Sequence, residues 1–398
     1  MTRVGVKEYV DALRDRYARG SKKEKGKVLD EFVRVVGYHR KSAVRLLGHG
    51  NRAIHRGKRG RGRLYKGEVV DVLRMAWEAT DHLCSKRLQP FLPELVPVLR
   101  QYGNRHISAE VAAQLCRMSP ATIDRLLGPW RRADGHHRFS LTKPGTLLKS
   151  AIPIRTFAEW EDESPGFLEV DLVHHCGEST DGFYLTTLSA VDVATGWSEC
   201  MAVWGKGQQR VGSAIHKMRQ RLPFLLLGLD SDNGSEFINH HLLTYCQKEH
   251  ITFTRSRSYK KNDSCYVEQK NWSVVRRIIG YDRYSTKPSL ETMNRIYDIL
   301  RLYVNFFQPA MKLCSKTRHG SRVHRVYDTA QTPYRRLLAS GMLTEHKRQE
   351  LAAIQAGINP FLLRQHLDGN LKRLWDLADK PGSQPTTTEK TTYGNTHL

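Results

Sequence analysis

Three acidic residues near the middle of the chain have the types and the spacing that metal-dependent phosphoryl transfer requires. Asp171 lies inside the apolar run Phe-Leu-Glu-Val-Asp-Leu-Val, Asp232 opens the string Asp-Asn-Gly-Ser-Glu-Phe, and Glu268 lies in Tyr-Val-Glu-Gln-Lys-Asn. A carboxylate inside an apolar strand is costly to bury unless a metal ion or a strong partner compensates its charge. Each acid alone could be an ordinary turn, cap or ion-pair residue, so the hypothesis depends on their meeting at one point.

The elements around these acids can bring them together. Apolar patterns predict strands at 167–174, 183–193, 198–204, 224–229 and 251–254, and helices at 211–222, 236–248, 267–279 and 290–307. Three successive strands followed by alternating helix and strand predict a mixed sheet with helices on both faces. Asp171 then lies in a central strand, Asp232 follows the fourth strand at a turn favoured by Asn-Gly, and Glu268 lies at the start of a helix beside that edge.

The spacing and the flanking strings resemble those of a known catalytic core. Sixty residues lie between Asp171 and Asp232, and 35 lie between Asp232 and Glu268. Together with the strings around Asp232 and Glu268, this spacing is similar to the D, D-35-E core of retroviral-integrase-type transposases, over about 140 of the 398 residues. The resemblance implies an RNase H-like fold and a bacterial insertion-sequence DDE transposase. The zinc module found at the front of retroviral integrases is not evident in this sequence.

The resemblance also implies an activity and a cofactor. Such an enzyme binds the terminal inverted repeats of its own mobile element and catalyses DNA strand cleavage and strand transfer. We expect two Mg²⁺ ions, with Mn²⁺ as a substitute, because carboxylate oxygens suit hard divalent cations. Asp171 would bridge both ions, Asp232 would bind one and Glu268 the other. Asp230 and Glu169 are the nearest competing acids, and Glu169 shares the strand face of Asp171, where it could support the ligands.

The charge distribution is typical of a protein that binds a polyanion. Lys and Arg number 64 against 40 acidic residues, a net charge of +24. The excess is uneven, because residues 1–150 hold 32 basic and 14 acidic residues, whereas residues 151–200 hold one basic and ten acidic residues. This reversal predicts a basic DNA-binding part joined to a part that needs carboxylates, rather than a protein that is merely soluble and basic.

Cysteine usage and hydropathy restrict the environment. The seven cysteines stand singly with no Cys-x-x-Cys pair, so neither a disulfide framework nor a zinc knuckle is indicated. No apolar run approaches about 18 residues and no signal peptide is evident. We therefore expect a cytoplasmic protein at the bacterial nucleoid, with double-stranded DNA as its partner and no membrane association. Two transposon ends need two active sites, so we expect a homo-oligomer on DNA.

Two helical segments in the basic half are candidates for helix-turn-helix DNA binding. The first opens with Ser21 and Glu24 in a capping-box pattern, can end at Gly37, and leads into a second helix at 39–47. The second lies within 67–133, where Ser119 can cap a helix that begins at Pro120. Helix pairs of this kind also occur in proteins that never bind DNA. The DNA-contacting residues expected from the two pairs are Arg40, Lys41, Arg45, Thr122 and Arg125.

Further DNA contacts are expected outside the helix pairs. The Arg- and Gly-rich segment 51–66 carries Arg59, Arg61 and Arg63, which could enter a minor groove, although the segment could also be a solvated linker. Basic residues around the third acid are expected to contact phosphates, with a solvated helix face as the alternative. These residues are Lys260, Lys261, Lys270 and Arg276.

Several conspicuous side chains near the acids receive structural interpretations. Asp192 lies near a turn, and one of His174 and His175 is expected to point into the core. The tryptophans of this region are more often packing residues than base-stacking residues. They are Trp197, Trp204 and Trp272.

The expected organisation is multidomain. N-terminal all-α helix-turn-helix domains precede an α/β RNase H-like core with a mixed five-stranded sheet and a small C-terminal domain. The expected parts are helix-turn-helix domains at 1–50 and 67–133, a basic linker at 51–66, a connector at 134–165, the core at 166–307, the C-terminal domain at 308–380 and a disordered tail at 381–398. The alternative to an active transposase is a transposase-derived DNA-binding protein that performs no chemistry.

Overall fold

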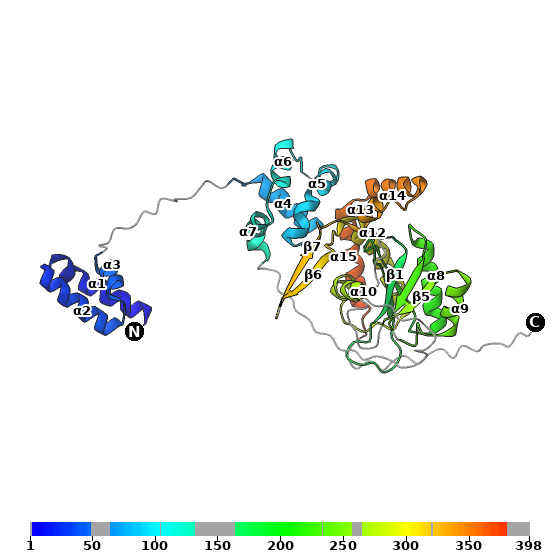
Figure 1. Ribbon diagram of the computed structural model, residues 1–398, viewed down its shortest axis with the longest axis horizontal. Coiled ribbons are helices and arrows are strands. Elements are labelled where there is room, and N and C mark those ends of the chain that lie inside the picture. The colour runs from blue at the N-terminus through cyan, green and yellow to red at the C-terminus, as the bar shows by residue number, and fades with distance from the viewer. Residues whose placement is uncertain are drawn as a thin grey trace, which may run out of the picture. The chain divides into compact units, whose positions relative to one another are not determined.

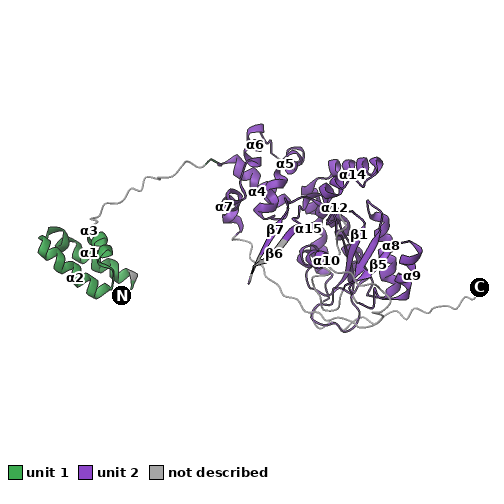
Figure 2. Ribbon diagram, in the orientation of Figure 1, with its two compact units in different colours: residues 1–64 green, residues 65–398 purple. Residues whose placement is uncertain are grey.

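The computed structural model divides into two compact units, residues 1–64 and residues 65–398 (Figure 2). The structure describes residues 2–48, 64–103, 105–131, 164–232, 234–256, 265–319 and 321–379. Some expected features lie outside these ranges. They are Arg59, Arg61, Arg63, Lys260, Lys261, most of the expected connector and the expected tail.

The first unit contains three helices around a small apolar core. They are α1 (Arg3–Arg19), α2 (Lys22–Val36) and α3 (Arg40–Gly48). The capping box at Ser21 forms as predicted, because Ser21 Oγ accepts the Glu24 amide at 3.4 Å and Glu24 Oε2 accepts the Ser21 amide at 2.7 Å. Gly37 ends α2 with φ 73°, a conformation that glycine adopts without strain. Sequence reasoning missed α1, whose residues Val10 and Leu13 complete the core.

The second unit begins with four helices that pack against one another. They are α4 (Glu68–Ala79), α5 (Ser85–Tyr102), α6 (Ala109–Cys116) and α7 (Pro120–Arg131). Ser119 Oγ accepts the Thr122 amide at 3.3 Å, so α7 starts where the sequence predicts. Leu115 of α6 and Ile123 and Leu127 of α7 are buried in the same apolar cluster.

A mixed five-stranded sheet forms the centre of the second unit. Its strands are β1 (Phe167–His174), β2 (Thr186–Asp192), β3 (Ser198–Val203), β4 (Gly228–Ser231) and β5 (Thr252–Arg255). The order is β3-β2-β1-β4-β5, with β1, β2 and β3 antiparallel and β1, β4 and β5 parallel. The mixed five-stranded sheet expected from the sequence is therefore confirmed, with β1 in the middle.

The boundaries of two predicted elements near the sheet were wrong. The strand expected at 224–229 is β4 at 228–231, because pairing with β1 starts only at Phe167 and Gly228, and Leu225 in the apolar run before it is 79% exposed. The helix expected at 236–248 is α9 (His240–Lys248). It begins later because Asn239 Oδ1 caps it by accepting the Leu242 amide at 2.9 Å.

Helices cover both faces of the sheet (Figure 1). On one face, α8 (Gln208–Arg221) and α9 pack against Leu168 and Val170 of β1. The other face carries α10 (Cys265–Lys270), the π-helical turn η3 (Asn271–Arg276), α11 (Arg277–Ile279) and α12 (Lys287–Phe307). There Val173 packs with Val275 and Tyr297. Because side chains alternate along a strand, Glu169 and Asp171 share this second face.

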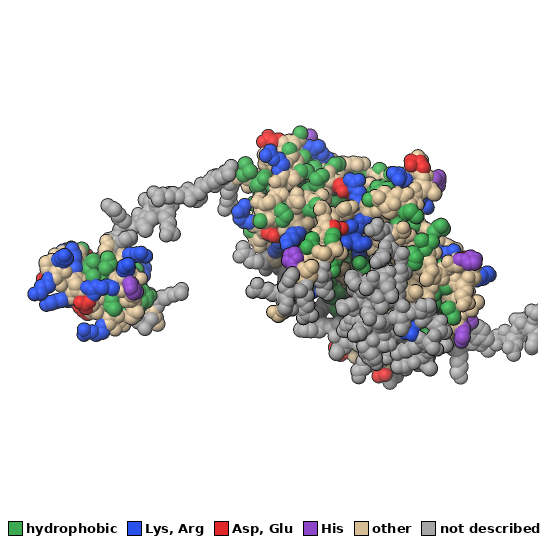
Figure 3. All heavy atoms as spheres, in the orientation of Figure 1, with side chains coloured by type: hydrophobic (Ala, Val, Ile, Leu, Met, Phe, Trp, Pro, Cys, Tyr) green, Lys and Arg blue, Asp and Glu red, His purple; other side chains and the backbone are tan. Residues whose placement is uncertain are grey.

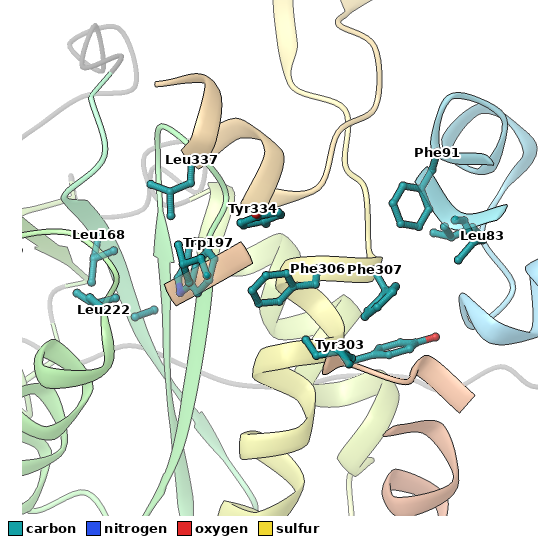
Figure 4. Packing of buried hydrophobic residues seen from close by; sticks show 14 of the residues in the cluster. Leu83, Phe91, Leu168, Trp197, Leu222, Tyr303, Phe306, Phe307, Tyr334 and Leu337 are labelled. Carbon is teal, nitrogen blue, oxygen red and sulfur yellow. The ribbon is translucent and has the colours of Figure 1, made fainter. Parts of the chain in front are cut away.

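The end of α12 joins the sheet to the preceding helices. Phe306 and Phe307 lie between Trp197, which immediately precedes β3, and Phe91 of α5 in one continuous apolar cluster (Figure 4). Tyr303 adds a hydrogen bond of 2.8 Å to the carbonyl oxygen of Ala79. The remaining elements are β6 (Leu313–His319) and β7 (Arg322–Tyr327), which form a hairpin, and α13 (Pro333–Ala339), α14 (Glu345–Gly357) and α15 (Pro360–Asp376). Within the described ranges, no helix combines the length and the apolarity needed to cross a membrane.

Candidate active site

Asp171 and Asp232 lie at equivalent positions of two adjacent parallel strands. In the register between β1 and β4, Glu169 is opposite Asp230 and Val170 is opposite Ser231. Asp171 is the next residue of β1, and Asp232 immediately follows β4. Paired residues of neighbouring strands point to the same face, so the sheet directs both carboxylates to the face covered by α10.

The electrostatics of Asp171 bring the third acid into the same site. Burial and the negative charges of Asp232 and Glu268 raise the pKa of the Asp171 carboxyl to about 7, while two hydrogen bonds to the carboxylate act to lower it. Those bonds come from the Leu172 amide to Oδ1 at 2.8 Å and from Asn271 Nδ2 to Oδ2 at 2.6 Å. The charges of Asp232 and Glu268 therefore disfavour ionisation of Asp171, an effect that a bound divalent cation would oppose.

Asp232 is held by the turn that follows β4. Its Oδ1 accepts the Gly234 amide at 2.9 Å, and burial raises its pKa, with a further contribution from Glu236. A Cβ at Gly234 would lie 2.7 Å from the Glu236 carboxyl group and 3.0 Å from Asp232 Oδ1. A larger residue here would therefore displace the Glu236 and Asp232 carboxylates.

Glu169 supports the helix that carries Glu268. Its Oε2 accepts the Val267 amide at 2.8 Å, so it caps α10 one residue before the exposed Glu268. Glu169 is 0% exposed, and burial raises its pKa to about 8, with a smaller contribution from Asp230. Asp230 is buried as well and accepts a hydrogen bond of 2.5 Å from Thr254 on β5. Glu169 and Asp230 thus lie buried beneath Asp171 and Asp232, and each has a structural hydrogen-bond partner of its own.

Asn271 is a site residue that sequence reasoning did not single out. It starts η3, and a π-helical turn inside an α-helix is rare and frequent at functional sites. Its Nδ2 contacts Asp171, whereas its buried Oδ1 has no hydrogen-bond partner among the described residues. The signal in the sequence was its position three residues after Glu268, which places both side chains on one side of the helix.

The donor set fits a hard divalent cation. It consists of carboxylate oxygens from Asp171, Asp232 and Glu268, with the amide oxygen of Asn271 nearby, and oxygen donors are the ligands that Mg²⁺ prefers. Within the part of the chain that the structure describes, no three His, Cys, Asp or Glu side chains are close enough to enclose an ion by themselves. Asp171 and Asp232 are matched in strand register, and both Asp232 and Glu268 influence the pKa of Asp171.

The basic residues expected to contact phosphates near Glu268 are partly engaged within the protein. Lys270 is half-buried, and loss of hydration lowers the pKa of its ammonium group to about 8, with a contribution from Arg87. Arg276 is half-buried too, donates to the carbonyl oxygen of His174 at 2.9 Å and lies over the Tyr281 ring. Neither side chain is freely displayed to solvent.

The residues expected to contact DNA in the helical parts lie mostly at the surface. Lys41 and Arg45 of α3 are exposed, and Arg40 is exposed while it pairs with Asp30. In α7, Arg125 is exposed and donates to the half-buried Thr122 at 3.3 Å. These positions leave the cationic groups accessible to a polyanion.

The structure agrees with the structural roles expected for Asp192 and for one of the two histidines. Asp192 is buried and accepts the Gly166 amide and both the amide and the hydroxyl of Thr195. His175 points into the core and bonds Thr187 Oγ1 at 2.7 Å, and burial lowers its pKa to about 3.

The expectation that the tryptophans are packing residues was right for Trp197 and Trp204 and wrong for Trp272. Trp197 is 1% exposed and packs in the core, and Trp204 is half-buried against Phe183. Trp272, in contrast, is 63% exposed.

Comparison with known proteins finds a relative that matches along most of the chain. The uncharacterized protein y4rM of Sinorhizobium fredii (strain NBRC 101917 / NGR234) is 40% identical over 332 residues, which is 83% of this chain and 94% of that protein. No family model matches the chain.

Two solved structures show a distant likeness. The catalytic core domain of BIV integrase is similar with 19% identity and a TM-score of 0.29, covering 45% of this chain and 97% of that chain. The HTLV-2 integrase catalytic core domain, a dimeric form in complex with magnesium, has 16% identity and a TM-score of 0.28, covering 37% of this chain and 90% of that chain. At these TM-scores neither likeness assigns a function to this chain.

Proposed function

We propose that this chain, which belongs to the family of the uncharacterized protein y4rM, is a DDE-type DNA transposase. In this proposal it is a polynucleotidyl transferase that binds the terminal inverted repeats of its own mobile element and cleaves and joins DNA strands. The observation that carries the proposal is the Asp171 carboxyl, whose pKa is raised to about 7 by burial together with Asp232 and Glu268. Carboxylates that raise one another's pKa beside a central strand are typical of functional sites.

Each residue of the site then has a defined part in the reaction. Asp171, Asp232 and Glu268 would hold two divalent ions, which supply Lewis-acid stabilisation of the reacting phosphate when bound. Asn271 orients Asp171 through its 2.6 Å hydrogen bond, and Glu169 fixes the start of the helix that carries Glu268. These supports keep the carboxylates in place before substrate arrives, and such preorganisation is what makes an electrostatic site effective.

The basic parts of the chain supply the contact with DNA in this proposal. Lys and Arg side chains spread over the visible surface of the first unit, and few acidic side chains lie among them (Figure 3). Lys and Arg that neutralise phosphates give affinity by releasing counterions, so the proposal predicts strongly salt-dependent binding. Cutting and joining two element ends requires two active sites, and we propose that a homo-oligomer assembles on double-stranded DNA.

The test uses labelled duplex DNA that matches the ends of the element encoding the protein. Wild type is compared with Asp232→Asn in Mg²⁺, in Mn²⁺ and in EDTA, and Glu291→Gln, which alters an exposed carboxylate of α12, serves as the matched control. The proposal expects metal-dependent nicks and joined strands from wild type and the control, and neither from Asp232→Asn. DNA binding by wild type without cleavage in either metal would overturn it in favour of a DNA-binding protein that performs no chemistry.

A further inference from the structure

Trp272 is the most exposed aromatic side chain among the described residues, with 63% of its surface accessible. Single exposed apolar side chains are common on protein surfaces and need no explanation by themselves. The position of Trp272 is what distinguishes it. The residue lies in η3, on the segment that also carries Glu268 and Asn271.

The helix displays Trp272 on the side where the acids converge. Asn271, the preceding residue, donates to Asp171 at 2.6 Å, and Glu268 precedes Trp272 by four residues, a spacing that returns to nearly the same side of a helix. The opposite side of the segment is fixed in the core, where Val267 and Val274 are buried. The indole therefore stands in solvent next to the candidate ligands, and the buried side prevents the segment from rotating to hide it.

The surroundings of Trp272 favour a nucleic acid over a protein as the group it contacts. Glu268 and Gln269, its neighbours on the accessible side, are both exposed and polar. A protein interface needs a contiguous apolar centre, which one indole among polar groups does not provide. A nucleobase needs only one flat aromatic partner, and stacking on an aromatic side chain contributes about 1–3 kcal/mol per base whatever the base.

We propose that Trp272 stacks on a nucleobase beside the phosphate that reacts at Asp171, Asp232 and Glu268, and so holds the DNA end in position. The inference rests on the proposed function, because it takes the DNA end as the substrate of this site. Trp272 contacts the substrate without taking part in bond making. Its removal therefore weakens the productive seating of the DNA end and leaves the folded protein intact.

The test compares Trp272→Ala, Trp272→Leu and Trp272→Phe in the full chain. The matched control is Trp375→Ala, which removes an indole that is 51% exposed on α15. Strand cleavage in Mg²⁺ is measured on the duplex of element ends, and melting temperature is measured for every variant. We expect kcat/KM to fall about 5- to 150-fold in the Ala and Leu variants, which is the stacking contribution converted at tenfold per 1.4 kcal/mol.

The Phe variant should keep most of the activity because it retains a ring, and Trp375→Ala should match wild type. All melting temperatures should stay close to that of wild type, since the side chains are exposed. A second readout uses the same duplex with 2-aminopurine beside the cleaved phosphate, bound in Ca²⁺. Wild type should quench its fluorescence, and the Ala and Leu variants should not.

The outcomes separate the inference from the proposed function. Wild-type rates in both Trp272→Ala and Trp272→Leu would overturn the inference while leaving the transposase proposal intact. Absence of cleavage by wild type would count against the transposase proposal. The 2-aminopurine signal would still decide whether Trp272 stacks on the bound DNA, because it needs binding and no chemistry.

Discussion

Replacing Glu169 with Gln tests whether its carboxyl group supports the site or binds metal. Gln keeps the size of the side chain and an oxygen that can accept the Val267 amide, which lies 2.8 Å from Glu169 Oε2. It removes the group that burial makes hard to ionise. We therefore expect Glu169→Gln to retain DNA cleavage, whereas Glu169→Ala should lose most of it, because α10 and Glu268 lose their anchor.

The magnitude follows from the pKa of Glu169, which burial raises from 4.5 to about 8. The folded protein holds this proton more tightly than the unfolded chain, so wild type loses stability as pH rises from 4.5 towards 8. Gln does not titrate. The pH dependence contributed by the other titratable groups is common to both proteins, so it cancels when their stabilities are compared. Linkage gives Glu169→Gln a gain in unfolding free energy of about 3 to 4 kcal/mol relative to wild type between pH 5 and pH 8.

Urea unfolding in EDTA at several pH values measures this gain. All seven tryptophans lie in residues 65–398, so their fluorescence reports on the unit that contains Glu169. With a denaturant slope of about 3 kcal/mol per molar, the midpoint of Glu169→Gln should move by about 1 M relative to wild type between pH 5 and pH 8. A difference between the urea midpoints of wild type and Glu169→Gln that does not change with pH would refute the reasoning. A Glu169→Gln protein that binds DNA and cannot cleave it would refute it too.

Four further predictions concern other parts of the chain. Asn271→Ala should slow cleavage about 10-fold or more with DNA affinity unchanged, because Asp171 loses a charge-assisted hydrogen bond; single-turnover rates test this. Because the pKa of Asp171 is about 7, apparent Mg²⁺ affinity should weaken about fivefold from pH 7 to pH 6, and equal affinities at the two pH values in a metal titration would contradict this. Arg301→Met should lower the unfolding free energy by about 3 kcal/mol in urea, because the buried Glu199 loses its 2.6 Å partner; an unchanged midpoint would count against it. Arg125→Ala should reduce affinity for the element ends by about 1–3 kcal/mol and leave affinity for unrelated DNA nearly unchanged, which a fluorescence anisotropy titration of both duplexes can decide.

Local patterns were sufficient to predict many of the elements. The capping box at Ser21, the start of α7 at Pro120 and the bounds of β1 all depend on residues within a few positions of one another. The sequence also determined the order of strands and helices, and with it the mixed five-stranded sheet. It indicated the three acids through their spacing and flanking strings, and their role as metal ligands stays a prediction.

The tertiary structure decided what surrounds those acids. Glu169 caps a helix through Val267, 98 residues later in the chain, and Asn271 contacts Asp171 across 100 residues. No short-range pattern in the sequence indicates either contact, because each depends on how α10 packs on the sheet. The exposure of Trp272 has the same origin, since packing of the opposite side of its segment fixes which side chains remain in solvent. Short-range propensity places the carboxylates on their elements, and long-range register and packing decide which groups support them and which meet the substrate.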